Sequence, residues 1–349
     1  MNYSKIIVFY FSGTGNAKTA AGWIVENAKT KNIEAQLVNI SEIKGFDSIE
    51  LPNDALLGFC YPTHGFNAPP LVLKFLTKFP KAKSDVFLLN TRAGMKLYKL
   101  FTPGLSGLAL LLPAIILKIK GYRIKAFRPL DLPSNWISLH PGLRKNVVDS
   151  IFRRCKKIVY FFSERIFAGK RVHRGLFDLP IDLAISPIAM AYYLFGRFAL
   201  AKTFFATNKC DNCGICIKSC PVNAIEIIDT RNFWTFSCES CMKCMNNCPK
   251  QAIQTAHSYT FLIWWLAFSL VPYSVIKLLA KHDLINSSWL SSHFDLLFYS
   301  FMIVFGFILV FLGYRLMHFL LRYRFFNILI SYSTLTRFRF WRRYNAPQK

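Results

Sequence analysis

Eight of the ten cysteines in this chain of 349 residues lie between positions 210 and 248, and they repeat one spacing twice. In each run three cysteines stand three residues apart, and a fourth follows four residues later, directly before a proline. The runs are made of Cys210, Cys213, Cys216 and Cys220, and of Cys238, Cys241, Cys244 and Cys248. Dense cysteine use of this kind in a reducing compartment favours metal binding over disulfide bonds.

The spacing C-x2-C-x2-C-x3-C-P is that of bacterial sequences that bind [4Fe–4S] clusters. Three thiolates of one loop bind one cluster, and the fourth cysteine binds the other. We therefore predict one cluster on Cys210, Cys213, Cys216 and Cys248, and a second on Cys238, Cys241, Cys244 and Cys220. Zinc is the alternative, because paired cysteines also form zinc ribbons, but three evenly spaced cysteines would overfill a tetrahedral site.

The two cysteine runs end in similar tails, CPVNAI and CPKQAI, which indicates a pseudo-twofold unit with a short helix after each fourth cysteine. Over about residues 205–257 the chain resembles a bacterial two-cluster ferredoxin. That resemblance implies a small α+β domain with a role in electron transfer.

A second signal lies at the start of the chain, where KIIVFYFSGTGNAKTAAGWIVENA reads as an apolar strand, a glycine turn and a helix. Free backbone N–H groups and the positive end of the helix dipole stabilise a phosphate at such a helix start. A simple strand-to-helix turn is the alternative. The predicted phosphate loop consists of Ser12, Gly13, Thr14, Gly15, Asn16 and Ala17.

Four more strand candidates follow, EAQLVNI, DALLGFC, DVFLLN and YRIKAFRPL, with helical stretches between them. This alternation predicts a doubly wound α/β sheet. Over about residues 1–170 the chain resembles flavodoxin, which implies a parallel sheet of order 2-1-3-4-5 that binds flavin mononucleotide (FMN) at the carboxyl ends of its strands.

The flavodoxin resemblance implies that the loops after the third and fourth strands hold the flavin ring. His64 or Phe66 would stack on the ring, and Arg92 would stabilise a reduced, anionic flavin. Ala17 departs from the threonine that flavodoxins usually have, and Lys18 would compensate electrostatically. The residues of these two loops are Pro62, Thr63, His64, Gly65 and Phe66, and Asn90, Thr91, Arg92, Ala93 and Gly94.

Together the two domains, in this order, resemble a family of bacterial flavodoxin/ferredoxin fusion proteins, the ferrodoxins, over about residues 1–257. The stretch PSNW after the fifth strand, a basic helix over about 143–170 and an apolar linker over 171–204 are also similar to that family. No second glycine fingerprint with a following acidic residue is found, so we expect no NAD(P)H site.

The segments 259–276 and 296–313 lack formal charges, and with their flanks each reaches the length of about 20 residues that crosses a bilayer. We predict a transmembrane hairpin with helices over about 259–280 and 295–316. Two buried core helices are the alternative. Pro272 falls inside the first span, which bilayer helices tolerate.

The chain carries a formal net charge of +26, and much of this charge flanks the apolar stretches. Lys and Arg are sparse between the spans and frequent in the tail over 322–349, which predicts that both termini and the redox domains are cytoplasmic. Nothing at the start resembles a signal peptide. We expect the aromatic and basic stretch TRFRFWRRY to lie on anionic lipids of the cytoplasmic membrane rather than on nucleic acid.

The apolar stretches Leu105–Leu117 and 181–206 are harder to place. A helix that is apolar all round is buried somewhere, and both are too short or too interrupted to be clear spans. We expect them to lie against the bilayer or the hairpin, with a conventional core as the alternative. Cys60 and Cys155 are expected to be buried thiols, and His140 a loop histidine bonded to the backbone.

These features predict a membrane-anchored electron-transfer protein that relays low-potential electrons between FMN and two [4Fe–4S] clusters towards a soluble or membrane redox partner. No acid/base pair is evident, so no catalytic residue is assigned. One alternative is a reductase of a quinone or another small molecule, with a pocket beside Leu105–Leu117. The other is a non-catalytic redox sensor or a subunit of a larger membrane complex.

Overall fold

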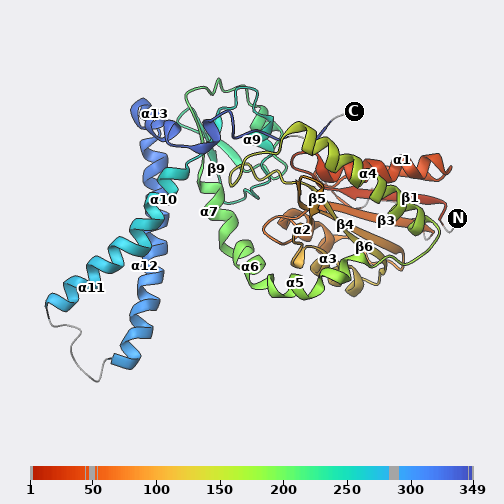
Figure 1. The fold of residues 1–349 in the computed structure, drawn as a ribbon, viewed down its shortest axis with the longest axis horizontal. Helices are drawn as coiled ribbons and strands as arrows, with labels where there is room; N and C mark the ends of the chain where they lie inside the picture. The colour runs from red at the N-terminus through yellow and green to blue at the C-terminus, as the bar shows by residue number, and fades with distance from the viewer. Residues whose placement is uncertain are drawn as a thin grey trace.

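The computed structural model shows three parts: an α/β domain, a smaller cysteine-rich region and an arm of long helices (Figure 1). The linker helices run along one side of the α/β domain and lead into the cysteine-rich region. The structure describes residues 3–43, 45–46, 52, 54–282, 291–344 and 346–347.

The α/β domain is built on a parallel sheet of order β2-β1-β3-β4-β6. The predicted order 2-1-3-4-5 is confirmed, because the fifth parallel strand is the one labelled β6. The short β5 (Leu100–Thr102) instead pairs antiparallel with the end of β4. The parallel strands are β1 (Lys5–Tyr10), β2 (Glu34–Asn39), β3 (Ala55–Pro62), β4 (Asp85–Leu97) and β6 (Arg123–Pro133).

Helices cover both faces of this sheet. On one face lie α1 (Asn16–Thr30) and α4 (Lys145–Phe167), which pack against each other. On the other face lie α2 (Pro70–Lys78) and α3 (Leu108–Ile119). A turn of 3-10 helix, Ile40–Glu42, follows β2.

The core has two layers because alternate residues of a strand point to opposite faces of a sheet. In β1, Ile6 and Val8 face α1 and α4, whereas Ile7 and Phe9 face α2 and α3. The first layer continues without a break into the cysteine-rich region, where Trp234 belongs to the same buried cluster. The two domains therefore share one core.

Helix α3 corrects the expectation for the apolar stretch Leu105–Leu117. Its inner face packs on the sheet, where Leu110 and Leu117 are 2% and 0% exposed. Its outer residues Ile115 and Ile119 are 54% and 77% exposed. This stretch is therefore a conventional sheet-covering helix with an additional apolar face towards the outside.

The linker is mostly helical, and it is tied to the α/β domain by a buried carboxylate. The side chain of Asp182, 3% exposed, accepts hydrogen bonds from the backbone of Ser106 and Gly107 at 3.1 and 2.7 Å. The two halves of the linker, Arg174–Ala184 and Ser186–Lys202, meet at 75°. Only the two halves together are long and apolar enough to cross a membrane, and they would do so as a broken span. Its elements are Arg174–Asp178, α5 (Leu179–Ala184), α6 (Ser186–Ala191), a π-helical turn Tyr192–Gly196 and α7 (Arg197–Lys202).

The cysteine-rich region is a small α+β unit, as expected. It contains two short antiparallel strand pairs, β7 with β10 and β8 with β9. Its elements are β7 (Phe204–Ala206), α8 (Ile215–Lys218), β8 (Ile225–Ile228), β9 (Arg231–Trp234), α9 (Lys243–Asn247) and β10 (Ile253–Thr255).

In the part of the chain that the structure describes, two helical segments are long and apolar enough to cross a membrane, His257–Leu279 and Tyr299–Leu320. The first consists of α10 (His257–Trp265), a π-helical turn Leu266–Leu270 and α11 (Val271–Lys281). Pro272 lacks a backbone N–H, and a π-type turn just before it accommodates the missing hydrogen bond. The second segment lies in α12 (Ser291–Leu320). Most of the predicted loop between the spans, residues 283–290, lies outside the described residues.

The C-terminal segment differs from the expected membrane-surface tail. After α13 (Arg324–Tyr332) and a turn Leu335–Arg337, the chain runs back between the α/β domain and the cysteine-rich region. Trp341 and Tyr344 are only 8% and 4% exposed there. Burial of these two rings between the domains removes their apolar surface from water.

Candidate cofactor sites

The first predicted cysteine set surrounds one small pocket. Cys210, Cys213, Cys216 and Cys248 all line it, although Cys248 comes from the other end of the cysteine-rich region. Cys213 is exposed, and the other three are partly buried. The fold thus brings together the four thiols that the spacing assigned to one cluster.

The second set lies deeper, against the α/β domain. Burial raises the pKa of the Cys238 and Cys241 thiols to about 12, and the neighbouring Cys220 adds to both shifts. Burial raises the pKa of Cys244 further, again with Cys238, Cys241 and Cys220 as contributors. These mutual effects place Cys238, Cys241, Cys244 and Cys220 close to one another.

The two halves of the cysteine-rich region repeat each other 28 residues apart. The backbone N–H of Ala224 donates to Cys220 Sγ, and that of Ala252 donates to Cys248 Sγ, both at 3.3 Å. The left-handed backbone at Gly214, with φ of 72°, recurs at Met242, with φ of 61°. Hydrogen bonds to cluster sulfurs tune the reduction potential of such sites.

The short helices do not follow the fourth cysteines, as the repeated tails had suggested. Helices α8 and α9 lie between the third and fourth cysteine of each run. After each fourth cysteine the proline begins a tight turn, which ends at Asn223 and Gln251 with φ of 49° and 48°. Proline restricts the preceding residue to extended backbone, so a helix ends there.

Within the described residues, no group of three or more His, Cys, Asp or Glu side chains is close enough to hold a single metal ion. A [4Fe–4S] cluster instead has four irons, and each of its four cysteine thiolates binds a different one, so the thiols need not meet at one point. The chemistry of the donors, four thiols around each site, suits iron–sulfur ligation.

The predicted phosphate loop connects β1 with α1 and is held in shape by its own side chains. The N–H of Gly15 donates to Ser12 Oγ at 3.1 Å, and Gly15 takes a φ of 103° that favours glycine. The hydroxyl of Thr14 accepts from Asn135 Nδ2 at 2.7 Å. The amide of Asn16 donates to the carbonyl of Pro133 at 2.8 Å.

The residues predicted after the third strand form a tight turn. Gly65 and Phe66 both have positive φ, 52° and 63°. His64 is 2% exposed, and its ring nitrogens have no partner among the described residues. Burial lowers the pKa of His64 to about 4, so the ring is neutral at pH 7. Its ring meets Phe11 edge-on, with centroids 6.3 Å apart.

The residues predicted in a loop after the fourth strand lie inside β4 instead. Strand β4 continues to Leu97, and its pairing with β6 runs on to Gly94 opposite Pro133. A Cβ on Gly94 would meet the Asp131 carbonyl at 2.5 Å, which explains the glycine. Pairing with β6 and with β5 extends the strand beyond the apolar run that the sequence pattern had marked.

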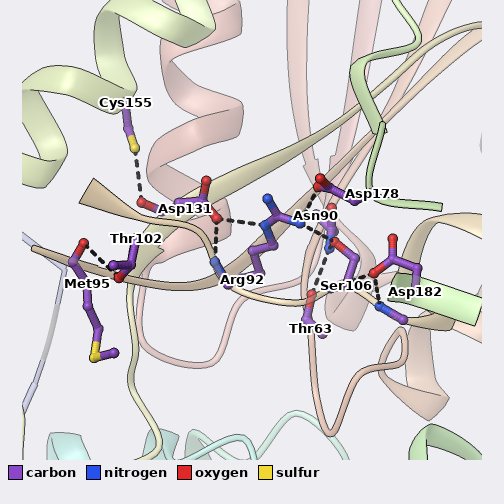
Figure 2. A network of polar contacts seen from close by, with 12 residues as sticks. Thr63, Asn90, Arg92, Met95, Thr102, Ser106, Asp131, Cys155, Asp178 and Asp182 are labelled. Carbon is purple, nitrogen blue, oxygen red and sulfur yellow. Dashed lines mark hydrogen bonds and ion pairs between the residues drawn. The ribbon is translucent and has the colours of Figure 1, made fainter. Parts of the chain in front are cut away.

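Arg92 is the centre of a buried ionic network (Figure 2). Its guanidinium contacts Asp131 Oδ1 and Asp178 Oδ2, both at 2.6 Å, and its side chain is 5% exposed. Asp178 belongs to the linker, so this network also fixes the linker to the sheet. Asn90, next to it in Figure 2, donates to Thr63 Oγ1 at 2.8 Å and to Ser106 Oγ at 3.1 Å.

A cavity of about 210 Å³ lies at the carboxyl ends of the strands. The loop after β1, the turn after β3 and the end of β4 all line it. Of the predicted flavin residues, His64, Asn90, Gly15, Ala17 and Gly94 do not line it. The predicted residues that do are Ser12, Gly13, Thr14, Asn16, Pro62, Thr63, Gly65, Phe66, Thr91, Arg92 and Ala93.

Sequence reasoning missed one wall of this cavity, the loop after β6. Ser134, Asn135, Trp136 and His140 line it, and Leu105 closes another side. The fifth parallel strand ends at the same edge of the sheet as the other strands. Because ligands bind at this edge, the loop after the fifth strand could have been predicted as part of the site. The Trp136 Nε1 is buried without a hydrogen-bond partner among the described residues, and thus offers a donor to a ligand.

The phosphate loop and the second cysteine set lie against each other. A Cβ placed on Gly13 would come 2.4 Å from the carbonyl oxygen of Cys241 and 3.2 Å from its Cβ. Beside this contact, Tyr192 of the linker fills the space next to Gly65 and packs on Trp136, with ring centroids 5.3 Å apart. The two candidate cofactor sites therefore share a wall.

The fold and the cysteine sites define the class of protein. A doubly wound parallel sheet of order 2-1-3-4-5, counted over its parallel strands, is the flavodoxin-like fold. Residues 209–253 match a family model described as a 4Fe-4S dicluster domain. Eight cysteines in such a domain imply two [4Fe–4S] clusters.

Solved structures similar to the α/β domain include flavodoxins. A flavodoxin from the domain Archaea is 17% identical, with a TM-score of 0.31, over 46% of this chain and 98% of that one. Flavodoxin 1 from Bacillus cereus is 15% identical, with a TM-score of 0.31, over 45% and 97%. Megasphaera elsdenii flavodoxin is 15% identical, with a TM-score of 0.29, over 44% and 98%. No curated protein matches the chain.

Proposed function

We propose that this protein is a membrane-anchored electron-transfer protein that carries FMN and two [4Fe–4S] clusters. The observation that carries the proposal is the contact between Gly13 of the phosphate loop and Cys241 of the second cysteine set. Electron transfer needs short separations between redox groups, and two sites that share a wall provide one.

The residues around the sheet-edge cavity hold FMN in this proposal. The phosphate lies at the start of α1, on the loop Ser12–Ala17, where backbone N–H groups and the helix dipole favour an anion. The ring lies towards Phe66 and Ala93. The cavity volume of about 210 Å³ is below the ~300 Å³ at which small-molecule pockets begin, so side chains such as Phe66 and Leu105 move outwards when FMN binds.

When bound, FMN exchanges electrons singly or in pairs, whereas each [4Fe–4S] cluster exchanges one. The buried cysteine set faces the flavin site, and the set with the exposed Cys213 faces solvent. The chain thus presents the outer set to a redox partner protein, while the shared core holds the inner set against the α/β domain.

The helices His257–Leu279 and Tyr299–Leu320 form the membrane anchor in this proposal. Basic residues after the second span, among them Arg322 and Arg324, keep that end in the cytoplasm of the cell, as the positive-inside rule predicts. We therefore propose that the protein lies in the cytoplasmic membrane with its redox domains in the cytoplasm.

The test is an anaerobic titration of the purified protein, followed by optical absorption and electron paramagnetic resonance. We expect one flavin and eight irons per chain. The Cys213→Ala variant should lose one cluster signal and keep the flavin. The Gly15→Val variant should release flavin, because a side chain at φ of 103° is strained. A colourless protein, or one that contains zinc alone, would refute the proposal.

A further inference from the structure

A second, larger cavity of about 750 Å³ lies where α12 meets the cysteine-rich region. One wall comes from the last turns of α12, with Phe311, Leu316 and Phe319. The opposite wall comes from the strand pair β8 and β9, with Ile228 and Phe233. Its size falls within the ~300–1,000 Å³ typical of small-molecule sites.

The charges in this cavity are mostly positive. Lys202, Arg231, Arg315 and Arg322 line it, and Asp229 is the carboxylate among the lining residues. Asp229 pairs with Arg322, with Nη2 and Oδ2 2.8 Å apart. The other three cations have no carboxylate partner among the lining residues, and they give the cavity a positive potential that favours an uncharged acceptor or an anionic ligand.

Aromatic rings surround these donors. The Lys202 ammonium lies 4.3 Å from the ring centroids of both Phe233 and Phe236, and it donates to the carbonyl of Trp234. The Arg315 guanidinium lies 5.9 Å from the Phe311 ring centroid. Flat apolar walls with a few convergent donors suit a planar ligand that carries oxygen acceptors.

One side chain separates this cavity from the outer cysteine set. Asn232 lines both the cavity and the pocket of Cys210, Cys213, Cys216 and Cys248. Its Nδ2 lies 3.6 Å from Cys210 Sγ, within the range of a hydrogen bond to sulfur. A ligand in this cavity would thus sit next to a redox centre.

The same cavity lies at one end of a candidate membrane span. Leu316 and Phe319 belong both to its lining and to the span Tyr299–Leu320. Leu316 is 51% exposed and Phe319 is 48% exposed. A lipid-soluble molecule can therefore reach the cavity along the helix surface.

We propose that this cavity binds a lipid-soluble quinone, which accepts electrons at the outer cysteine set. A quinone combines a flat ring, two carbonyl acceptors and an apolar tail, and each matches one feature of the cavity. An anionic phospholipid would match the charges and the membrane position, but it would gain nothing from Asn232 and a cluster ligand. The inference rests on the proposed function, because reduced clusters must supply the electrons.

The reaction balances as a two-electron reduction. The outer cluster would pass one electron at a time to the quinone, and the inner cluster and the reduced flavin would reduce it again between the two transfers, so that two electrons reach one quinone. Two protons come from cytoplasmic water and form two O–H bonds, while the two C=O double bonds become C–O single bonds of the quinol. Lys202 and Arg315 hold the carbonyl oxygens and stabilise negative charge on them.

Binding can be tested without turnover. The full-length protein in detergent is irradiated with a photoreactive azidoquinone, and the labelled peptides are identified by mass spectrometry. We expect label within residues 228–236 and 311–322, and we expect decylubiquinone to compete for it. Label elsewhere, or competition by phosphatidylglycerol but not by decylubiquinone, would overturn the proposal.

Matched variants sharpen the test. Leu316→Trp fills the cavity and should weaken decylubiquinone binding at least tenfold, whereas Leu312→Trp, one turn away and outside the lining, should not. Arg315→Gln should weaken binding about tenfold, the usual effect of losing one charged hydrogen bond, whereas Arg324→Gln should have no effect. Equal affinities in either pair would contradict the assignment.

The paramagnetic resonance signals separate this inference from the proposed function. If all four variants keep two clusters and flavin, but the wild type neither binds decylubiquinone nor is oxidised by it, the quinone site is wrong and the electron-transfer function stands. If the wild type lacks the cofactors, the proposed function itself has failed.

Discussion

Gly13 is a residue whose missing side chain decides how the two redox domains meet. Its Cα lies so close to Cys241 that a Cβ would overlap a backbone oxygen at 2.4 Å. Backbone atoms cannot rotate away as a flexible side chain can, so a larger residue would push the two loops apart. The glycine in the sequence motif thus allows close approach to the cysteine loop.

We predict that Gly13→Ala lowers the free energy of unfolding by roughly 1–3 kcal/mol, as overpacking usually does. It should also slow the equilibration of electrons between flavin and clusters. Gly22→Ala is the control, because a Cβ there meets nothing within 4 Å inside helix α1. The control should be neutral or stabilising by up to about 1 kcal/mol. Thermal melts measure the stability of each variant, and stopped-flow absorption measures the rate of electron equilibration. Equal stability and equal rates in the two variants would contradict the contact between Gly13 and Cys241.

His64 is a second residue whose environment has a measurable consequence. Its pKa in the folded protein is about 4, below the ordinary value of 6.5 for histidine, because burial disfavours the charged ring. The unfolded chain therefore binds a proton first as the pH falls, and stability is lost between about pH 6.5 and pH 4. The loss should reach about 3 kcal/mol at the low end.

The His64→Phe variant should lack this part of the acid sensitivity. Thermal melts between pH 7 and pH 4 compare the two proteins, and only the slope with pH matters, since Phe also changes packing. Parallel curves for wild type and variant would show that His64 does not titrate in this range.

At the scale of elements, the C-terminal segment after α13 joins the two redox domains. The hydroxyl of Tyr344 donates to Asn16 Oδ1 of the phosphate loop at 2.5 Å, and the N–H of Ala346 donates to the carbonyl of Thr14 at 2.9 Å. Arg343 lies on the cysteine-rich side of the same segment, and burial lowers its pKa to about 10. The segment has the composition of a membrane-surface tail, but it connects the α/β domain with the cysteine-rich region. We call residues 338–344 and 346–347 the strap.

We predict that Arg343→Ala loosens this strap. The guanidinium donates to the carbonyls of Met245, Gln251 and Ile253 at 3.4, 3.4 and 2.9 Å, and removing it takes a charged donor from the partly buried carbonyls of Met245 and Ile253. The cost should be about 2–3 kcal/mol. Hydrogen exchange of residues 338–347 should rise in this variant and stay unchanged in Arg339→Ala, whose side chain is exposed. Unchanged protection in both would show that the strap is held by other contacts.

At the scale of the whole molecule, the chain has three parts: the α/β domain, the cysteine-rich region and the helical arm (Figure 1). The α/β domain and the cysteine-rich region share a buried core, so they form one structural unit. The helical arm instead exposes many large apolar side chains, such as Phe261, Phe301 and Ile303 at 74%, 62% and 52%. Such a surface is stable in contact with lipid tails and not in water.

We predict that the protein stays in the membrane pellet after washing at high pH with carbonate. Peripheral proteins held by charge alone are released by this treatment, whereas apolar helices are not. Fractionation of cells followed by immunoblotting measures it, and a soluble cytoplasmic protein serves as the control. Recovery in the supernatant would show that the arm packs against protein rather than lipid.

The sequence predicted the features that depend on local chemistry. The cysteine spacing reflects the geometry of iron–sulfur ligation within short loops, and the alternation of apolar strands and helices predicted a doubly wound sheet, whose order the resemblance to flavodoxin implied. Long apolar runs likewise indicated the two helices now found at His257–Leu279 and Tyr299–Leu320. In each case the sequence pattern and the physical interaction that produces it lie within a few dozen residues of the chain.

Other features were decided only by the tertiary structure. Strand β4 runs past Asn90 because β6 and β5 pair with it, Arg92 is neutralised by carboxylates distant in sequence, and Trp341 is buried between the domains. Such contacts join segments far apart in the chain, and their energy depends on how surfaces fit, which composition and periodicity do not encode. The shared wall between Gly13 and Cys241, and the cavity beside Asn232, exist only once the whole chain has packed.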